Sequence, residues 1–452
     1  MFKNINTGLI ASRGSYLTDR NRLLYTRLIT NSTGDQFYSS TTGYVYHVFT
    51  QPGSFDVHTR GPVDIMLVGG GGGGGGIKGT TNSNVQEGSG GGGAGGVRHI
   101  YNKVMPVATY QVTVGYGGAA GQNGATDQNE ETQSNMDGRG GRGGYSQIYH
   151  THRDVYPDVG NLPSSVPDAE AYQKEDGSIS RNGIDFFREW GTRHRSLPNI
   201  YYPSSYLQSI PQNLGRSFAL NVWGGGGGGY SLHEPTTYAP TASQAIIPLA
   251  HYGGGGGSGG GGGHRFIPNL AIGIEPGMNP DGSRERQSYE QAEGNLGGSG
   301  HKPWNSGPGN NGGGGGGGAG GAGNPGSNQP GSGQGGIGVA AFGGDTGIPA
   351  QYGTPGPPSA TSGTRWFGGG GWGGNNQLPN AQLFNYQTDG WFGGGGVSSV
   401  ASDPSFYPKD GKTNTGGGGA GARTYTPYNQ VFIESAGTGG SGIVMIRYQQ
   451  SL

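Results

Sequence analysis

Apolar side chains gather in a few short stretches that alternate between polar and apolar positions. The clearest stretches are Tyr44–Phe49, Ser54–Val57, Val63–Val68, Val97–Tyr101, Thr109–Val114 and Ser441–Tyr448. Pro52-Gly53 and Gly61-Pro62 separate the first three. Alternating stretches rich in β-branched and aromatic residues, divided by glycine and proline, are typical of strands joined by tight turns. The pattern therefore predicts several short β-strands.

Long runs of glycine fill much of the chain between these stretches. The main runs are 69–76, 90–96 with one alanine, 224–229, 253–257, 259–263 and 312–318. Trp366-Phe367 and Trp391-Phe392 are each followed by four glycines, and Trp223 precedes a further run. A repeated unit of an aromatic residue and a glycine run indicates stacking of like elements. We expect Trp223, Trp366, Phe367, Trp391 and Phe392 to cap the glycine runs.

A glycine run can adopt the extended left-handed helix of the polyproline II kind, with three residues per turn and about 3.1 Å of rise per residue. Its N–H and C=O groups point outward and need partners. Because glycine has no Cβ, several runs can approach closely and bond to one another. The sequence therefore predicts a mostly β fold with irregular glycine-rich layers, in which short strands bracket polyglycine II-type helices and α-helix is scarce.

Changes in glycine content divide the chain into four parts. Residues 1–42 contain no glycine run, and we expect them to be an N-terminal attachment segment that docks on another subunit. Residues 43–148 are the first part of a β and glycine-rich domain. Residues 149–221 are an inserted region rich in tyrosine, proline and charge, and residues 222–452 are the second part of the domain with a closing strand.

The composition supports a structural role over catalysis. Of 452 residues, 105 are glycine and 27 are proline, which is unusual for a packed enzyme domain. The net charge of −1 gives no field that would attract nucleic acid or an anionic membrane. The absence of cysteine excludes disulfides and thiol catalysis. No apolar stretch has the length of a signal peptide core or a membrane span, so we expect neither.

Four pieces of the sequence share a distinctive pattern: 63–72 (VDIMLVGGGG), 91–97 (GGGAGGV), 110–118 (YQVTVGYGG) and 439–448 (GGSGIVMIRY). These pieces, and their order along the chain, resemble the glycine-rich domain of tail and virion proteins from tailed bacteriophages. The closing piece is the most specific of the four. The inserted region and the N-terminal segment depart from that pattern.

The resemblance implies a structural protein of the virion, in a tail fibre or spike, that contributes to host attachment. A capsid-decorating or head-fibre protein is an alternative, and a silk-like cell-surface or matrix protein is an alternative of another class. We expect a homo-oligomer, with a trimer inferred from the analogy to fibres, that contacts other virion proteins through its N-terminal segment. A host surface glycan or protein is the expected external partner.

A few residues are candidates for binding, whereas none forms a recognisable catalytic set. Paired acids lie in polar stretches without apolar neighbours, so we expect no enzyme and no cofactor. His150 and His152 are spaced to hold a metal ion where chains meet on a symmetry axis. Exposed aromatic residues can stack on sugars or anchor an interface. The candidates for such receptor or interface contacts are Trp190, Tyr201, Tyr202, Tyr206 and Trp304.

Overall fold

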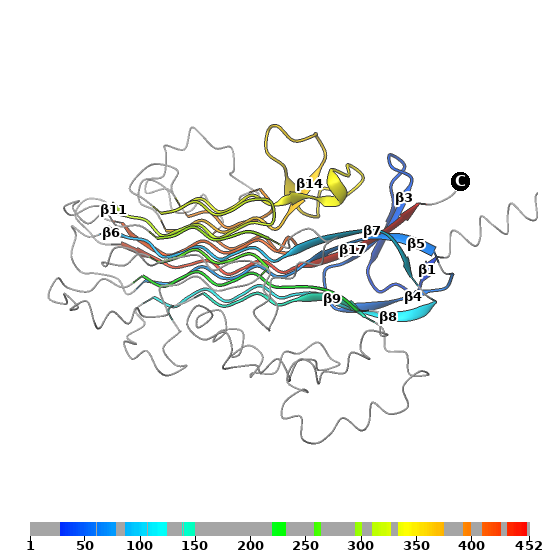
Figure 1. Cartoon of the computed structure of the whole chain (residues 1–452), viewed down its shortest axis with the longest axis horizontal. Coiled ribbons are helices and arrows are strands. Elements are labelled where there is room, and N and C mark those ends of the chain that lie inside the picture. The colour runs from blue at the N-terminus through cyan, green and yellow to red at the C-terminus, as the bar shows by residue number, and fades with distance from the viewer. Residues whose placement is uncertain are drawn as a thin grey trace, which may run out of the picture.

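The computed structural model gives a mostly β protein with a β-sandwich at one end and a bundle of extended glycine runs at the other (Figure 1). The described residues are 28–59, 61–77, 86–105, 107–123, 138, 140–149, 219–231, 257–263, 294–300, 310–326, 333–374, 392–398, 409–425 and 432–449. They contain no α-helix, and their one helical element is the 3-10 turn η6 (Ala341–Gly343). The expectation of a mostly β fold is confirmed.

Two five-stranded antiparallel sheets form the sandwich. The strands of the first sheet lie in the order β2 (Asp35–Tyr38), β3 (Tyr44–Phe49), β17 (Ile443–Gln449), β5 (Gly61–Val68) and β7 (Val97–Met105). Those of the second lie in the order β1 (Ile29–Thr30), β4 (Gly53–Val57), β8 (Ala108–Thr113), β9 (Ser146–Tyr149) and β10 (Ala219–Val222). Strands β1 and β2 fall within the expected attachment segment.

The closing strand β17 lies at the centre of the first sheet. It pairs with β3 on one side and with β5 on the other, so that Ile446 lies opposite both His47 and Ile65. All but the last residue of β17 are buried. The first sheet is therefore complete only when β17 has inserted between β3 and β5.

Each face of the first sheet contributes to a separate apolar core, as the alternation of a strand requires. Toward the second sheet, Val45, Phe49 and Val444 pack with Phe55 and Tyr110. The opposite face is covered by residues 339–367, which we call the cover segment. This face and the cover segment together form the second core. Its residues include Tyr46, Val48, Met66, Met445, Phe342, Ile348, Tyr352 and Phe367.

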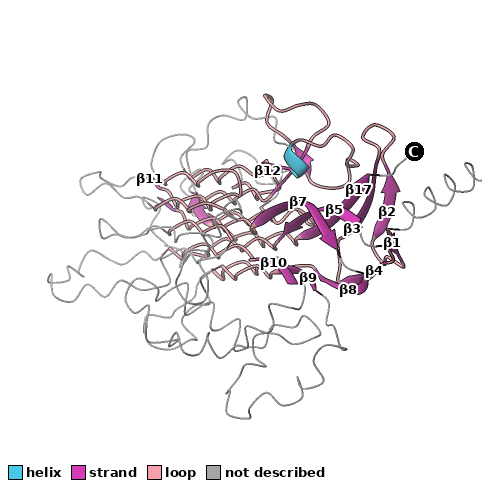
Figure 2. Ribbon diagram, turned by 45° about the vertical axis from the view of Figure 1, so that its right-hand side comes forward, coloured by secondary structure: helices cyan, strands magenta, loops and turns pink. Residues whose placement is uncertain are grey.

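The cover segment is built from η6 and a small antiparallel sheet (Figure 2). Its strands are β12 (Val339–Ala340), β14 (Arg365–Phe367) and β13 (Thr354–Pro355), in that order. Arg365 donates hydrogen bonds to the carbonyls of Ala350 and Tyr352 and so holds the intervening loop to β14. The segment buries the second core although it contains little regular secondary structure.

Extended glycine runs continue from the strands of the sandwich and form a bundle (Figure 1). We call these runs together the glycine bundle. It comprises residues 69–77, 88–96, 115–122, 140–145, 223–231, 257–263, 294–300, 312–326, 333–338, 368–374, 393–398, 409–422 and 435–442. Most carry no regular strand pairing, and their backbones bond from run to run.

The hydrogen bonds of the central run 69–76 repeat every third residue. Gly69, Gly72 and Gly75 donate to run 90–96, at N···O distances of 2.8–3.0 Å. Gly70, Gly73 and Gly76 donate to run 138–144. Gly71 and Gly74 donate to run 437–440. Carbonyl groups of the central run accept bonds from three further runs, 115–121, 224–231 and 416–422. One run therefore bonds to six neighbours in six directions.

At the central glycines, the spacing between the runs leaves no room for a side chain. A Cβ added to Gly72 would lie 2.1 Å from the carbonyl oxygen of Gly226, and one added to Gly74 would lie 1.8 Å from that of Ala420. The runs at the surface instead carry side chains on their outer side. In run 115–122 the buried residues are Gly115, Gly118 and Gly121, and the exposed ones are Tyr116, Ala119 and Gln122.

Short strands and an ion pair close the end of the bundle that is remote from the sandwich. Here β6 (Gln86–Glu87) pairs with β11 (Asn310–Asn311), and β15 (Arg423–Tyr425) pairs with β16 (Phe432–Glu434) (Figure 1). Arg423, fully buried, contacts Glu434 at 2.8 Å. Strand pairing and one buried ion pair thus close the bundle at this end.

The first prediction tests the spacing of the runs. Replacing Gly72 with alanine should lower the free energy of unfolding by about 3 kcal/mol or prevent folding, because the new Cβ would overlap a neighbouring backbone. Gly321 is the matched control, since a Cβ there would meet nothing closer than 3.4 Å. Gly321→Ala should change the stability by less than about 0.5 kcal/mol. Denaturant unfolding followed by circular dichroism measures both, and equal stabilities would contradict the described packing.

Candidate functional site

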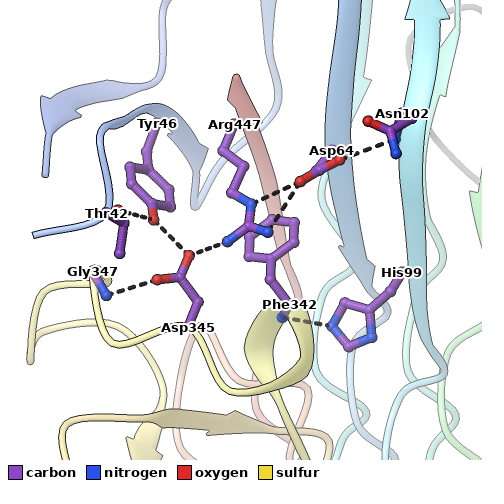
Figure 3. Close-up of polar contacts among 9 residues, drawn as sticks. All are labelled: Thr42, Tyr46, Asp64, His99, Asn102, Phe342, Asp345, Gly347 and Arg447. Atoms are coloured by element: carbon purple, nitrogen blue, oxygen red, sulfur yellow. Dashed lines mark hydrogen bonds and ion pairs between the residues drawn. The ribbon is translucent and has the colours of Figure 1, made fainter. Parts of the chain in front are cut away.

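The most connected polar cluster of the described residues lies between the first sheet and the cover segment, around Arg447 (Figure 3). Arg447 is on β17, and its Nε donates to Asp64 of β5 at 3.0 Å. Its Nη1 contacts the carboxylate of Asp345 in the cover segment. The guanidinium carbon lies 4.2 Å from the ring centres of both Tyr44 and Phe342. We call this arrangement the arginine clamp.

The two carboxylates of the clamp are saturated with donors. Asp345 also accepts bonds from the hydroxyl of Tyr46 at 2.5 Å and from the backbone N–H of Gly347 at 2.7 Å. Asp64 accepts a bond from the backbone N–H of Asn102 at 3.0 Å. Arg447, Asp64 and Asp345 are each less than one tenth exposed. Such satisfaction is what keeps buried charges from destabilising a fold.

The pKa values of the clamp residues reflect burial together with the neighbouring charges. Burial, and then the hydrogen bond to Asp345, raises the pKa of the Tyr46 hydroxyl well above its usual range. Burial alone would lower the pKa of Arg447, but Asp345 and Asp64 outweigh it and raise the value. Tyr46 therefore stays neutral and Arg447 stays charged across the neutral range.

Backbone strain accompanies the clamp. Phe342 has φ of +45°, in the left-handed region that residues with bulky side chains rarely adopt. This conformation places its ring on the guanidinium of Arg447. Asn102 also has positive φ, +52°, where the pairing of β5 with β7 shifts between Val63 and Ile65. The contacts of the clamp hold both residues in these conformations.

The arrangement is suited to holding two parts of the chain together. The guanidinium bonds to carboxylates from β5 and from the cover segment while two rings enclose it, so its donors point at fixed partners. No three histidines or acidic residues within the described part of the chain gather closely enough to hold a metal ion. We therefore interpret the clamp as a fastening of the cover segment onto the closing strand.

Two imidazoles, that of the buried His47 and that of the partly buried His99, lie on opposite faces of the first sheet. His47 is completely buried in the core between the sheets, and its ring lies 5.8 Å from that of Tyr448. Neither ring nitrogen of His47 has a hydrogen-bond partner among the described residues. His99 lies beside the clamp and accepts a bond from the N–H of Phe342 at 3.2 Å. Burial lowers the pKa of both imidazoles to about 4.

The residues expected to cap glycine runs are only partly within the described residues. Phe367 is buried in the second core directly before run 368–374. Trp366 precedes it and donates from its ring nitrogen to Thr364. Trp223 begins run 223–231, with the guanidinium of Arg142 5.8 Å from its ring centre. The carbonyl of Phe392 accepts a bond from Gly338. Capping by these side chains stays a prediction.

The other candidate residues lie outside the described residues. They are His150, His152, Trp190, Tyr201, Tyr202, Tyr206, Trp304 and Trp391. Within the described part of the chain, no helix has the length and apolar character to cross a bilayer. The sequence carries one signal for the clamp. Asp64 and Arg447 are single opposite charges inside two otherwise apolar strands.

Comparison of the sequence with protein-family models finds no match, and comparison with curated proteins finds no similar sequence. The function must therefore be argued from the residues and the geometry of the chain.

The second prediction concerns the clamp. Replacing Arg447 with methionine should lower the free energy of unfolding by about 3–5 kcal/mol, because it leaves two buried carboxylates without their cation. Arg447→Lys keeps the charge but loses the planar fork, so it should fall between the methionine variant and the wild type. Denaturant unfolding of the three proteins measures the effect. A methionine variant within about 1 kcal/mol of the wild type would contradict the role given to Arg447.

The third prediction concerns pH. Because His47 has a pKa of about 4 when folded and about 6.5 when unfolded, the unfolded chain binds more protons between these values. The free energy of unfolding should fall as the pH drops from 6.5 toward 4, and His47 should contribute up to about 3 kcal/mol of this loss. His47→Phe keeps a ring against Tyr448 and should show a smaller loss.

Thermal unfolding between pH 7.5 and pH 4.5 measures this dependence. The matched control is His58→Phe, since His58 lies on the surface. The unfolding temperature of His58→Phe should depend on pH as that of the wild type does. An identical acid loss in His47→Phe and the wild type would show that burial of this imidazole does not govern the dependence.

Proposed function

We propose that this chain is a structural protein of a bacteriophage virion, a component of a tail fibre or spike that contributes to host attachment. The role is mechanical and adhesive, not catalytic. One observation carries the proposal: a bundle of glycine runs, whose central run bonds to six neighbours, extends from the β-sandwich. The resemblance of segments 63–72, 91–97, 110–118 and 439–448 to glycine-rich virion proteins points the same way.

We further infer that the runs are polyglycine II-type helices. This helix has three residues per turn, so each N–H direction recurs every third residue. The bonds of the central run 69–76 have this period toward each of the three runs to which it donates. The alternation of one inward and two outward or partly exposed positions in run 115–122 supports the same period.

The geometry suits the display of surface segments. Strands β1 and β17 hold the two ends of the described chain in the sandwich, and the bundle extends away from the sandwich (Figure 1). A rod fixed at one end can present the segments that link its runs at a defined distance.

The inserted region is proposed to supply adhesive contacts. It runs from β9 to β10, and these two strands are antiparallel neighbours with Tyr149 opposite Ala219. The insertion thus begins and ends at paired residues, so a two-residue turn can replace it without disturbing the second sheet. The number of subunits stays a prediction. The inner runs of the bundle are buried within one chain, so their burial does not require an oligomer.

The fourth prediction is that gold-labelled antibody against this chain marks the tail of purified particles in electron micrographs. Labelling spread over the capsid would favour a capsid-decorating or head-fibre protein. Particles that carry no label, with the chain absent from their protein content, would overturn the proposal. Purified chain should also compete with the particles for adsorption to host cells.

Replacing residues 150–218 with Asn-Gly should abolish this competition if the inserted region is adhesive. The thermal unfolding of this variant should match that of the full chain, because β9 and β10 can still pair. A variant that folds and still competes as the full chain does would move the adhesive role to another part of the molecule.

A further inference from the structure

An irregularity in β7 brings Tyr101 to the surface beside the cover segment. The pairing of β5 with β7 shifts between Val63 and Ile65, and Asn102 adopts a left-handed backbone conformation. The N–H of Asn102 donates to Asp64, which fixes this bend. Irregularities of this kind re-aim a side chain, often next to a binding site. Tyr101 is 48% exposed as a result.

The ring of Tyr101 is supported by two further rings. It stacks on His99 with a centre-to-centre distance of 6.2 Å and an interplanar angle of 25°. His99 in turn lies 5.9 Å from the ring of Phe342. A ring held in this way loses little freedom when a ligand binds, which favours affinity. Its remaining face and edge are open to solvent.

The imidazole of His99 provides a hydrogen-bond donor at the same place. Its Nε2 accepts the bond from the N–H of Phe342, so that nitrogen carries no proton. The lowered pKa keeps the ring neutral at pH 7, and the proton is therefore on Nδ1. Among the described residues Nδ1 has no hydrogen-bond partner. A fixed N–H donor thus lies beside an exposed aromatic ring.

The cover segment leaves open space next to the ring. A Cβ added to Gly343 would meet only the hydroxyl of Tyr101, at 3.6 Å, and one added to Gly344 would meet only Thr364, at 3.9 Å. Both glycines have positive φ, which glycine adopts without strain, whereas the positive φ of Phe342 before them is strained. Strain such as that at Phe342 often accompanies a functional site. Backbone without side chains therefore borders Tyr101 on this side.

We propose that Tyr101, His99 and the turn at Gly343-Gly344 form a binding site for a neutral saccharide. The exposed face of a tyrosine ring fits the C–H face of a sugar, and the imidazole N–H can donate to a hydroxyl. The nearby charges of Arg447, Asp64 and Asp345 are bonded to one another in the clamp, so they leave no free charge to select an ionic ligand. This site concerns the chain itself and does not rest on a place in a virion.

The fifth prediction uses the purified full chain and fluorescent oligosaccharides built from glucose, galactose, mannose or N-acetylglucosamine. At least one of these should bind saturably, and Tyr101→Ala should weaken its binding about tenfold. Tyr101→Phe keeps the ring and should stay within about threefold of the wild type. Tyr116→Ala is the matched control, because Tyr116 is 47% exposed on a glycine run. It should bind as the wild type does.

A second variant guards against misfolding of Tyr101→Ala. Gly343→Asn places a side chain in the open space, and asparagine tolerates positive φ. It should also weaken binding about tenfold while its unfolding temperature stays near that of the wild type.

Binding of no neutral saccharide would overturn the proposal, and so would preference for sialylated or sulfated probes. Equal affinity of the wild type, Tyr101→Ala and Gly343→Asn would overturn it as well. Loss of particle attachment without loss of saccharide binding bears on the proposed function alone.

Discussion

The close approach of backbones that lack a Cβ is the constraint on which the rest of this structure depends. In the interior of the glycine bundle, a carbonyl oxygen occupies the place where a side chain would begin, as at Gly72 beside Gly226. Each run can then exchange hydrogen bonds with its neighbours, so buried N–H and C=O groups find partners without α-helices or β-sheets. Glycine also has the largest conformational entropy to lose on folding. Many lateral bonds must form together to offset that loss.

The β-sandwich supplies what the bundle lacks. The glycine bundle buries few apolar side chains, such as those of Ile77, Ala94 and Trp372, so most of its stability comes from hydrogen bonds whose net contribution is about 1 kcal/mol each. The sandwich buries two apolar cores and fixes the starting points of several runs, because β5, β10 and β14 lead directly into them. The arginine clamp then joins the cover segment, from which run 368–374 begins, to the closing strand. Side-chain packing at one end thus sets the register for backbone packing at the other.

The sequence predicts the sandwich strands better than the parts that cover them. The pattern of β-branched and aromatic residues located β3, β4, β5, β8 and β17 to within a few residues, because each of these strands packs at least one face in an apolar core. It did not locate β1 or β2, which are short and carry Asp35 and Gln36. The cover segment has no periodicity, since its fold depends on contacts with the first sheet. Asp64 and Arg447 stand out as charges in apolar strands, whereas Asp345 lies in a glycine-rich loop without any local signal.

The central position of β17 governs the order in which the molecule can fold. The contact between Arg447 and Asp64 joins residues 383 positions apart, and the first sheet stays divided between β3 and β5 until that contact can form. Native contacts this distant in sequence are associated with slow folding, because a long loop must close before they are gained. Until then the apolar faces of β3 and β5 lack their shared neighbour. Each newly synthesised chain therefore passes through this open state. To fold correctly, it must avoid associating with other chains until β17 is in place.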